Sequence, residues 1–261
     1  MQNQIRHMVA VTAVVFAAIG AAYAQSADVP RNEIEVRGNL TVPTGDADFS
    51  GTPTNSLNTI DFKRDFDFDN KLGFEVRFIH RSENQKHKFL ASYGRDNWDQ
   101  ERTLTRSFTF RGETYLGNAS ADLGITLRKF RAGYAYRWGN EKIRFGPAAD
   151  LGFITASAKL TGMTNNGVRT TEGSITKFVG TLGYDLEAHP IPKVTIFHTL
   201  GGIVFQGDKV FNTEGGVKVF PARHFGVVGG YKFQTVKLGG DNDNFIRVRQ
   251  HGPFFGGVVR F

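Results

Sequence analysis

The stretch Asp65-Phe-Asp-Phe-Asp-Asn-Lys-Leu-Gly-Phe-Glu-Val-Arg-Phe78 alternates between apolar and charged residues. Its even positions from Phe66 to Phe78 are mostly aromatic or aliphatic, and its odd positions from Asp65 to Arg77 are mostly charged. Because successive side chains of a β-strand point to opposite faces, this pattern predicts a strand with one apolar and one densely charged face. Strands of soluble proteins are commonly about five or six residues long, so the length favours a membrane barrel.

The same period of two recurs along the rest of the chain, and no stretch has the spacing of an amphipathic helix. The 31 glycines and 24 phenylalanines suit strands with one apolar face and tight turns. Residues 25–261 are therefore predicted to form one all-β domain, a closed antiparallel up-and-down transmembrane β-barrel of about ten strands, with eight or twelve strands as the alternatives. The expected strands are 32–42, 65–81, 87–97, 119–138, 142–160, 174–187, 193–205, 211–220, 224–238 and 246–261.

The expected strand 119–138 changes its pattern halfway. Apolar residues occupy odd positions from Leu123 to Leu127 and even positions from Phe130 to Trp138. This change predicts a β-bulge near Arg128 and Lys129, where one extra residue would exchange the two faces. The strand is also longer than a bilayer requires, so the barrel is expected to project beyond the outer surface.

The connections between the expected strands alternate in length, which is typical of outer-membrane barrels with long outer loops and short periplasmic turns. A further apolar alternation at 103–110 would make an eleventh strand and put the two termini on opposite sides of the membrane. We interpret it instead as the extended arm of an outer loop. The outer connections are expected at 43–64, 98–118, 161–173, 206–210 and 239–245. The periplasmic turns are expected at 82–86, 139–141, 188–192 and 221–223.

The N-terminus has the parts of a secretory signal peptide. Arg6 precedes an apolar run over 8–20, and Ala22 and Ala24 follow it two residues apart. The run is shorter than the roughly 20 residues of a spanning helix, which argues against a membrane anchor. Residues 1–24 are therefore predicted to be removed during export.

The last residues, Gly252 to Phe261, resemble the final strand of Gram-negative outer-membrane β-barrel proteins, in particular the small OmpA- or OmpW-type barrels. In that family a terminal Phe, alternating hydrophobic residues and an upstream Gly form the signal that the barrel-assembly machinery recognises. Phe261, Val259 and Gly256 occupy the matching positions, whereas Phe254 stands where the family usually has a polar residue. The resemblance implies an outer-membrane location, export through the periplasm, and the assembly machinery as a partner during biogenesis.

Charged residues of both signs fall on the faces expected to point into the lumen. Charges removed from bulk water need partners, so these residues are predicted to pair into a plug rather than to line an open pore. Asp122 is expected on the same inward face. The residues predicted to form this lumen charge network are Glu75, Arg77, Arg137, Arg144 and Asp150.

His198 is the histidine whose position bears most on function. If Thr195 and Thr199 face the lumen, His198 faces lipid, where a polar group is costly and commonly functional. In the opposite register His198 lies in a hydrogen-bonded interior. We favour the interior register, because the outward one rests on two threonines alone.

No chemical motif points to an activity. The sequence has no cysteine, which excludes disulfides, thiolate zinc sites and cysteine nucleophiles, and it lacks the nucleophile-elbow, zinc-protease and dinucleotide motifs. No cofactor, metal site or nucleic-acid partner is predicted. The leading prediction is a non-catalytic outer-membrane barrel with a charged, plugged lumen and a structural or surface-interaction role. A small diffusion channel is the alternative, and a lipid-A-modifying or protease-type barrel enzyme is a further one.

The two longest outer loops, 43–64 and 98–118, are polar and carry several cations. Positive charge outside the membrane suits the phosphates of lipopolysaccharide, so outer-membrane lipids and lipopolysaccharide are predicted partners. Ordinary solvated loops are the alternative. The loop cations are Lys63, Arg64, Arg102, Arg106 and Arg111.

Overall fold

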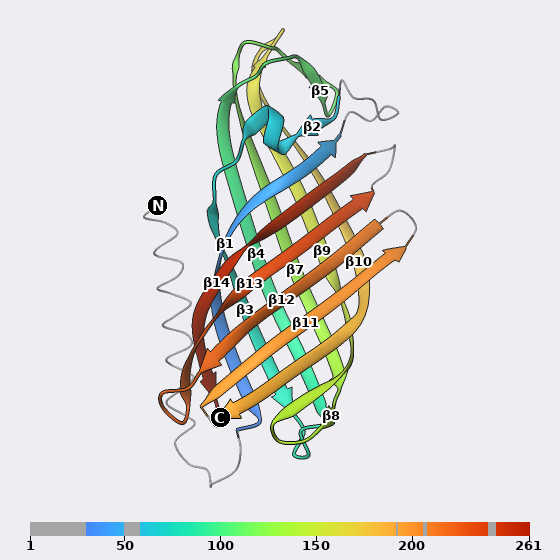
Figure 1. Ribbon diagram of the computed structural model, residues 1–261. Coiled ribbons are helices and arrows are strands. Elements are labelled where there is room, and N and C mark those ends of the chain that lie inside the picture. Colours follow the sequence, from blue (N-terminus) through green and yellow to red (C-terminus); the bar gives the residue numbers. More distant parts are fainter. Residues whose placement is uncertain (1–29, 50–57, 192, 206–207, 240–243) are drawn as a thin grey trace.

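The computed structural model describes residues 30–49, 58–191, 193–205, 208–239 and 244–261. Ten long strands, each antiparallel to the next, form a barrel that is closed by pairing of the first with the last (Figure 1). This confirms the predicted fold class and strand number. The long strands are β1 (Asn32–Asp48), β3 (Lys71–Arg81), β4 (His87–Thr103), β7 (Ser120–Tyr136), β9 (Ile143–Thr164), β10 (Gly167–Ile191), β11 (Val194–Phe205), β12 (Asp208–Val219), β13 (Phe225–Gly239) and β14 (Phe245–Arg260).

The remaining elements are short. They are β2 (Ile60–Asp61), the π-helical turn η1 (Phe62–Phe66), β5 (Phe108–Phe110), β6 (Glu113–Tyr115) and β8 (Trp138–Gly139). Within the described ranges, no helix is long and apolar enough to cross a membrane. The predicted signal peptide, 1–24, lies outside the described residues.

The first half of the alternating stretch 65–78 is not a strand, which corrects the prediction. Asp61 caps η1 by accepting hydrogen bonds from the backbone N–H groups of Lys63 and Arg64. Asp67 then adopts a left-handed conformation, with φ of 51°, and β3 begins only at Lys71. Phe66 and Phe68 are nonetheless both buried in the same hydrophobic core.

The rival strand at 103–110 is part of an outer loop, as predicted. β5 pairs with β6 in a small hairpin, and Tyr115 of β6 pairs with Thr164 of β9. The expected loop at 161–173 is wrong, because β9 and β10 continue through it and turn at residues 165–166. Threonine pairs such as Thr161 and Thr170, whose hydroxyl oxygens lie 2.9 Å apart, extend the ladder into water.

The predicted bulge in β7 is also wrong. The pairing of β7 with β4 and β9 runs without a break from Ala121 to Ala135. Leu127 and Lys129 are both buried inside the barrel, whereas Arg128 and Phe130 are both exposed outside it. The side chains keep alternating inward and outward without a shift, but the apolar residues move from the outer face of the strand to its inner face. The reason is a change of medium: apolar side chains face lipid below this point and face the interior above it.

A line of aromatic residues marks the same boundary on the neighbouring strands. Tyr93, Phe130, Phe153 and Phe178 are successive cross-strand partners on β4, β7, β9 and β10, and all four are exposed. Below this line, apolar side chains of β9 are exposed from Ile143 to Phe153, which matches the about 9–11 residues of a membrane-spanning strand. We call the part beyond it, residues 95–103, 120–128, 154–164 and 167–176 with the segments that cover them, the extension.

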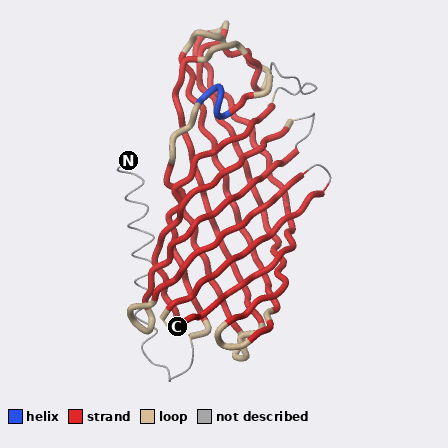
Figure 2. The backbone as a smooth tube through the Cα atoms, in the orientation of Figure 1, coloured by secondary structure: helices blue, strands red, loops and turns tan. Residues whose placement is uncertain are grey.

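The extension is filled by a hydrophobic core, whereas the spanning part is filled mainly by charges, with a small apolar cluster that includes Phe197 and Phe254. The strands of the extension contribute residues such as Trp98, Leu123 and Ile154. From above, η1 contributes Phe62, β5 contributes Phe110 and β6 contributes Tyr115. Figure 2 shows these loops and the helical turn folded over the end at which the long strands project. The extension is therefore built like a water-soluble β-structure standing on a membrane barrel.

The barrel closes where the two ends of the chain meet. Asn32 and Phe261 exchange both backbone hydrogen bonds, each at 2.9 Å, at the end of the barrel with the short turns. Gly256 of β14 lies against β1, and a Cβ atom built on it would lie 2.0 Å from the carbonyl oxygen of Val36. A Cβ on the adjacent Gly257 would meet nothing within 4 Å. The seam, which is the pairing of β1 with β14, therefore requires a glycine at position 256, whether or not the assembly machinery also recognises this residue.

We predict that Gly256→Ala weakens the seam and Gly257→Ala does not. The methyl group at 256 forces β1 and β14 apart, which should lower the unfolding free energy by about 1–3 kcal/mol. At 257 the change should be neutral or stabilise by up to about 1 kcal/mol, since it restricts only the unfolded chain. Urea unfolding in detergent micelles measures both. Equal stability of the two variants would contradict the close approach at 256.

The exchange of faces predicts where water reaches the outer wall. The chain has no cysteine, so single substitutions report cleanly. In liposomes, Lys159→Cys in the extension should react with a membrane-impermeant maleimide, and Leu151→Cys on the same face of β9 should not. Both should react after denaturation. Equal labelling of the folded variants would show that the boundary is not at Phe153.

Candidate functional site

The interior of the spanning part holds the largest group of buried ionisable residues. They come from alternate positions of β1, β3, β4, β7, β10, β12 and β13, which all turn one face inward, and from Arg137 directly after β7. Acids and bases are present in similar number, so opposite charges can pair. The buried acids are Glu33, Glu35, Glu75, Asp96, Asp185, Glu187 and Glu214, and the buried bases are Arg37, Arg77, Arg81, Lys88, Lys129, Arg137, Lys218 and Lys232.

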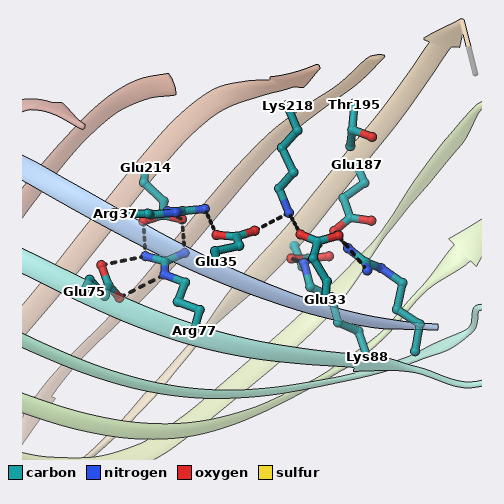
Figure 3. A network of polar contacts seen from close by, with 12 residues as sticks. Glu33, Glu35, Arg37, Glu75, Arg77, Lys88, Glu187, Thr195, Glu214 and Lys218 are labelled. Atoms are coloured by element: carbon teal, nitrogen blue, oxygen red, sulfur yellow. Dashed lines mark hydrogen bonds and ion pairs between the residues drawn. The ribbon is translucent and has the colours of Figure 1, made fainter. Parts of the chain in front are cut away.

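Arg77 and Glu214 form the centre of this network (Figure 3). The Arg77 guanidinium binds both oxygens of Glu214 across the lumen and both oxygens of Glu75, at 2.9 and 3.1 Å, on its own strand. Arg37 donates a third hydrogen bond to Glu214 at 3.2 Å and also pairs with Glu35. A planar guanidinium suits such bidentate contacts, which fix geometry as well as charge.

A second cluster lies nearer the short turns and is joined to the first through Lys218, which pairs with Glu33 and Glu35. Glu187 of β10 accepts from three cations: Arg137 at 2.6 Å, Lys88 at 2.7 Å and Arg81 at 3.1 Å. The acids and bases of the two clusters therefore form one continuous network across the barrel.

A polar layer separates this network from the apolar core of the extension. Lys129 donates to Asp96 and to Gln234, each at 2.8 Å, and Gln250 bonds Asp96 at 3.1 Å and Gln234 at 2.7 Å. Directly beyond, the Trp98 indole N–H donates to the backbone carbonyl of Thr41 at 2.9 Å. Along the axis of the barrel, the filling thus passes from a charge network, through a layer in which Gln234 and Gln250 bond the Lys129–Asp96 pair, to apolar side chains.

The interior leaves little space. Two small cavities of about 60 and about 40 Å³ are both lined by Arg77, Arg131 and Glu214. Cavities of this size hold a few water molecules at most. Breaking a buried ion pair by removing one partner costs about 3–5 kcal/mol, so the network is also expected to hold the lumen in one arrangement.

The structure joins some of the predicted network residues and separates others. Glu75, Arg77 and Arg137 are buried in it. Arg144 points inward at the mouth of the barrel but donates to the backbone carbonyl of Asn84, at 3.2 Å. Asp150 faces the interior, accepts from Thr181 at 3.3 Å, and reaches the network through Arg131, which lies 4.0 Å from Asp150 and 3.5 Å from Glu75.

Two features of the network were missed or misplaced by the sequence pattern. Asp122, expected inside, is exposed on the outer face of the extension, because β7 has no bulge. Glu187, which accepts from three cations, and Glu214, which binds Arg77 through both oxygens, were not among the predicted residues. Their positions, inward on strands that alternate with apolar residues, are the signal that could have found them.

The C-terminal strand places its motif residues on different sides. Val259 points outward, like its partner Ile34, whereas Phe254 is buried in the lumen. The Arg37 guanidinium lies 4.6 Å from the centre of the Phe254 ring. The aromatic residue that departs from the family pattern therefore replaces a polar lumen residue by offering a cation–π contact.

His198 lies on the outer face of β11, so the register that we favoured is wrong. Its neighbour Phe197 is buried inside, and His198 shares the outward face with the exposed Ile196. Its two ring nitrogens lie 2.9 Å from the Tyr184 hydroxyl and 3.2 Å from the Thr213 hydroxyl. Both polar atoms are satisfied on the barrel wall, which removes the cost of a polar group there.

The described residues hold no catalytic arrangement that we can build. No group of three or more His, Asp or Glu side chains in them could hold a metal ion. Their histidines lie at 80, 87, 189, 198, 224 and 251, all outside the extension. An Asp–His pair inside the loop end of the barrel is therefore not available among these residues.

Comparison with known proteins supports the fold. No family model and no curated protein matches the sequence. The structure is similar to that of the outer membrane protease OmpT from Escherichia coli, with a TM-score of 0.56, 8% identity, and 92% of this chain and 99% of that chain covered. It is also similar to the translocator domain of the autotransporter NalP from Neisseria meningitidis, with a TM-score of 0.51, 12% identity, and 99% and 98% covered. The ten-stranded barrel therefore has the fold of Gram-negative outer-membrane β-barrel proteins.

Proposed function

We propose that this chain is a non-catalytic outer-membrane barrel that presents the extension at the cell surface and conducts no solutes. The observation that carries this proposal is the double closure of the lumen. Mainly charges fill the spanning part, and a hydrophobic core fills the extension directly above it. Two closures of different chemistry in series leave no continuous aqueous path, which argues against a diffusion channel.

The same architecture suits a role in surface interaction. The extension is built on four strands, β4, β7, β9 and β10, that continue out of the membrane. It is therefore a rigid platform rather than a set of loose loops. Function on membrane barrels commonly lies in such surface elements, which the barrel positions. A barrel enzyme would need a catalytic constellation, and the described residues provide none.

The orientation follows from the turns and the ends. The short connections lie beside Asn32 and Phe261, and in barrels of this fold the short turns are periplasmic. Residues 1–24 would then direct export through the periplasm, and Gly256, Val259 and Phe261 would be read by the assembly machinery from that side. Lipopolysaccharide and outer-membrane lipids would surround the band from Ile143 to Phe153 and its neighbours.

Planar-bilayer recording tests the sealed lumen. The wild-type barrel should give no conductance steps. The double variant Arg77→Ala/Glu214→Ala, which removes both partners of the central contact, should also be silent, because the apolar core of the extension still closes the path. Heat-modifiable gel mobility confirms that both proteins are folded. Steps from the wild type would refute the proposal, and steps from the variant alone would show that the extension does not seal.

The assembly role of Phe261 is separable from its role in the seam. Deletion of Phe261 would remove both hydrogen bonds to Asn32, whereas Phe261→Ala keeps them and removes only the ring, which is exposed. We therefore predict that Phe261→Ala folds normally in detergent but shows impaired insertion in cells, seen as lost heat-modifiable mobility. Normal insertion in cells would refute the assembly signal, and an equal defect in detergent would make the ring a stability element.

A further inference from the structure

Most of the loop cations that the sequence pointed to are already used inside the loops. Arg64 and Arg106 both donate to Asp65, at 2.8 and 2.9 Å. Burial alone would raise the pKa of Asp65, but these hydrogen bonds outweigh it and hold the pKa below its usual value. Arg102 lies 3.7 Å from Asp67. These side chains stabilise the cover of the extension, so free positive charge must be sought elsewhere.

Such charge is found on the strands β12, β13 and β14, where three cations stand side by side. Lys209 is directly opposite Lys237, and Lys237 is directly opposite Arg247. All three point outward, since the residues next to them, such as Val210, are buried inside. We call Lys209, Lys237 and Arg247 the cation row. At about 4.8 Å between neighbouring strands, it spans about 10 Å of the outer wall.

The cation row is unfavourable without a counter-charge. Like charges directly opposite each other on a sheet are destabilising. In the described part of the chain, Arg247 has a bidentate partner in Asp46 of β1, and neither lysine makes an ion pair. Lys237 lies 5.9 Å from the Phe245 ring, which offers a weak cation–π contact but no anion. Among the described residues, the two lysines therefore have no anionic partner on the wall.

The cation row lies at the level where lipid head groups meet the barrel. Lys209 is two residues beyond Phe211 on the same outward face, and the Phe211 and Phe233 rings, 6.0 Å apart, belong to the lipid-facing side. Aromatic residues in such positions mark the interface between hydrocarbon and head groups. The first anions that the cation row can meet are thus the phosphates of the outer leaflet.

A groove continues the positive surface on one side. It has a volume of about 840 Å³, and its charged lining residues are Lys63, Arg64, Arg102, Arg247 and Arg249 with Asp46, Asp61 and Asp67. Three of these five cations pair with acids, and Lys63 and Arg249 make no ion pair among the described residues. Arg249 is exposed. Since Arg247 belongs both to the groove and to the cation row, the two features form one surface, wide enough for a head group with more than one phosphate.

We propose that the cation row and the adjoining groove bind the phosphates of an outer-leaflet lipid head group. This deepens the proposed function, on which its orientation rests, by naming a site and a ligand chemistry. The lysines neutralise one phosphate across β12 and β13, and Arg247 and Arg249 contact a second from β14. The bound lipid removes the repulsion within the cation row and holds the barrel wall in a fixed lipid environment.

Native mass spectrometry of the detergent-purified barrel tests the site, with diphosphoryl lipid A as the probe. The variant Lys209→Gln/Lys237→Gln should bind roughly 30-fold more weakly, from about 1 kcal/mol for each cation near an anionic lipid surface. The matched control Lys142→Gln/Lys193→Gln changes the net charge equally, at exposed positions beside the short turns. It should bind like the wild type. Equal loss in both variants, or no loss in either, would overturn the proposal.

Two further arms identify the source of the anion. Fully dephosphorylated lipid A should bind the wild type and the Lys209→Gln/Lys237→Gln variant equally well. Inorganic phosphate in millimolar excess should not displace the diphosphoryl lipid. Displacement would replace the lipid site with a site for small anions. Asp241 and Asp243 precede β14 in the sequence, so the variant Asp241→Asn/Asp243→Asn tests whether acids of the chain itself neutralise the lysines. If this variant binds the lipid more tightly than the wild type and is less stable without lipid, these aspartates are the partners of the lysines and the proposal is overturned. Conductance silence is unaffected by any of these results, so failure here leaves the sealed barrel standing.

Discussion

The structure depends on the need to pair every backbone N–H and C=O group in a medium that contains no water. A sheet in lipid can meet this need only by closing, because an open edge would leave a row of unpaired groups in hydrocarbon. Here the closure joins β1 to β14, the two ends of the folded chain, and requires a glycine at 256 so that the strands can approach. All other features of the barrel are consequences of how the space inside this closed wall is filled.

The wall is filled in two ways because it passes through two media. In the bilayer the outer face must be apolar, so the inner face carries the polar residues, and these balance their charges in pairs around Arg77, Glu214 and Glu187. Above the bilayer the outer face meets water, so the inner face can be apolar and pack as in a soluble protein. The two fillings meet at the layer of Asp96, Gln234 and Gln250, where neutral amides satisfy the last charges.

In this arrangement the interior of the barrel serves stability, and the outer surfaces are left for function. The interior has too little space and too many mutual contacts to be free for a ligand, so the surfaces open to partners are the outside of the extension and the outer wall. On that wall, the two lysines of the cation row make no ion pair with a described residue, whereas each buried acid of the lumen network meets a base. This contrast is the reason why we propose an outer-leaflet lipid as the partner of the two lysines.

The sequence alone determined the period of two, the number of long strands, the outer loop at 103–110 and the charged character of the lumen. These follow from local alternation, which reports the two faces of a strand whatever surrounds it. The same logic failed at β7, where alternation changed sides because the medium changed, and at 65–70, where Asp67 in a left-handed conformation replaced an extended residue. Alternation cannot distinguish these cases, since it records polarity and not what lies beyond each face.

Only the tertiary structure decided which inward residues meet. Glu187 and Glu214 each gather cations from strands far away in the sequence, because the curvature of a closed barrel brings opposite walls within the reach of an arginine side chain. The outward position of His198 depends likewise on the pairing of β11 with β10 and β12, not on its own neighbours. The cation row exists only through the register of three strands. Period and charge are local properties of the chain, whereas register and closure arise from all ten strands together, and they decide what each charge faces.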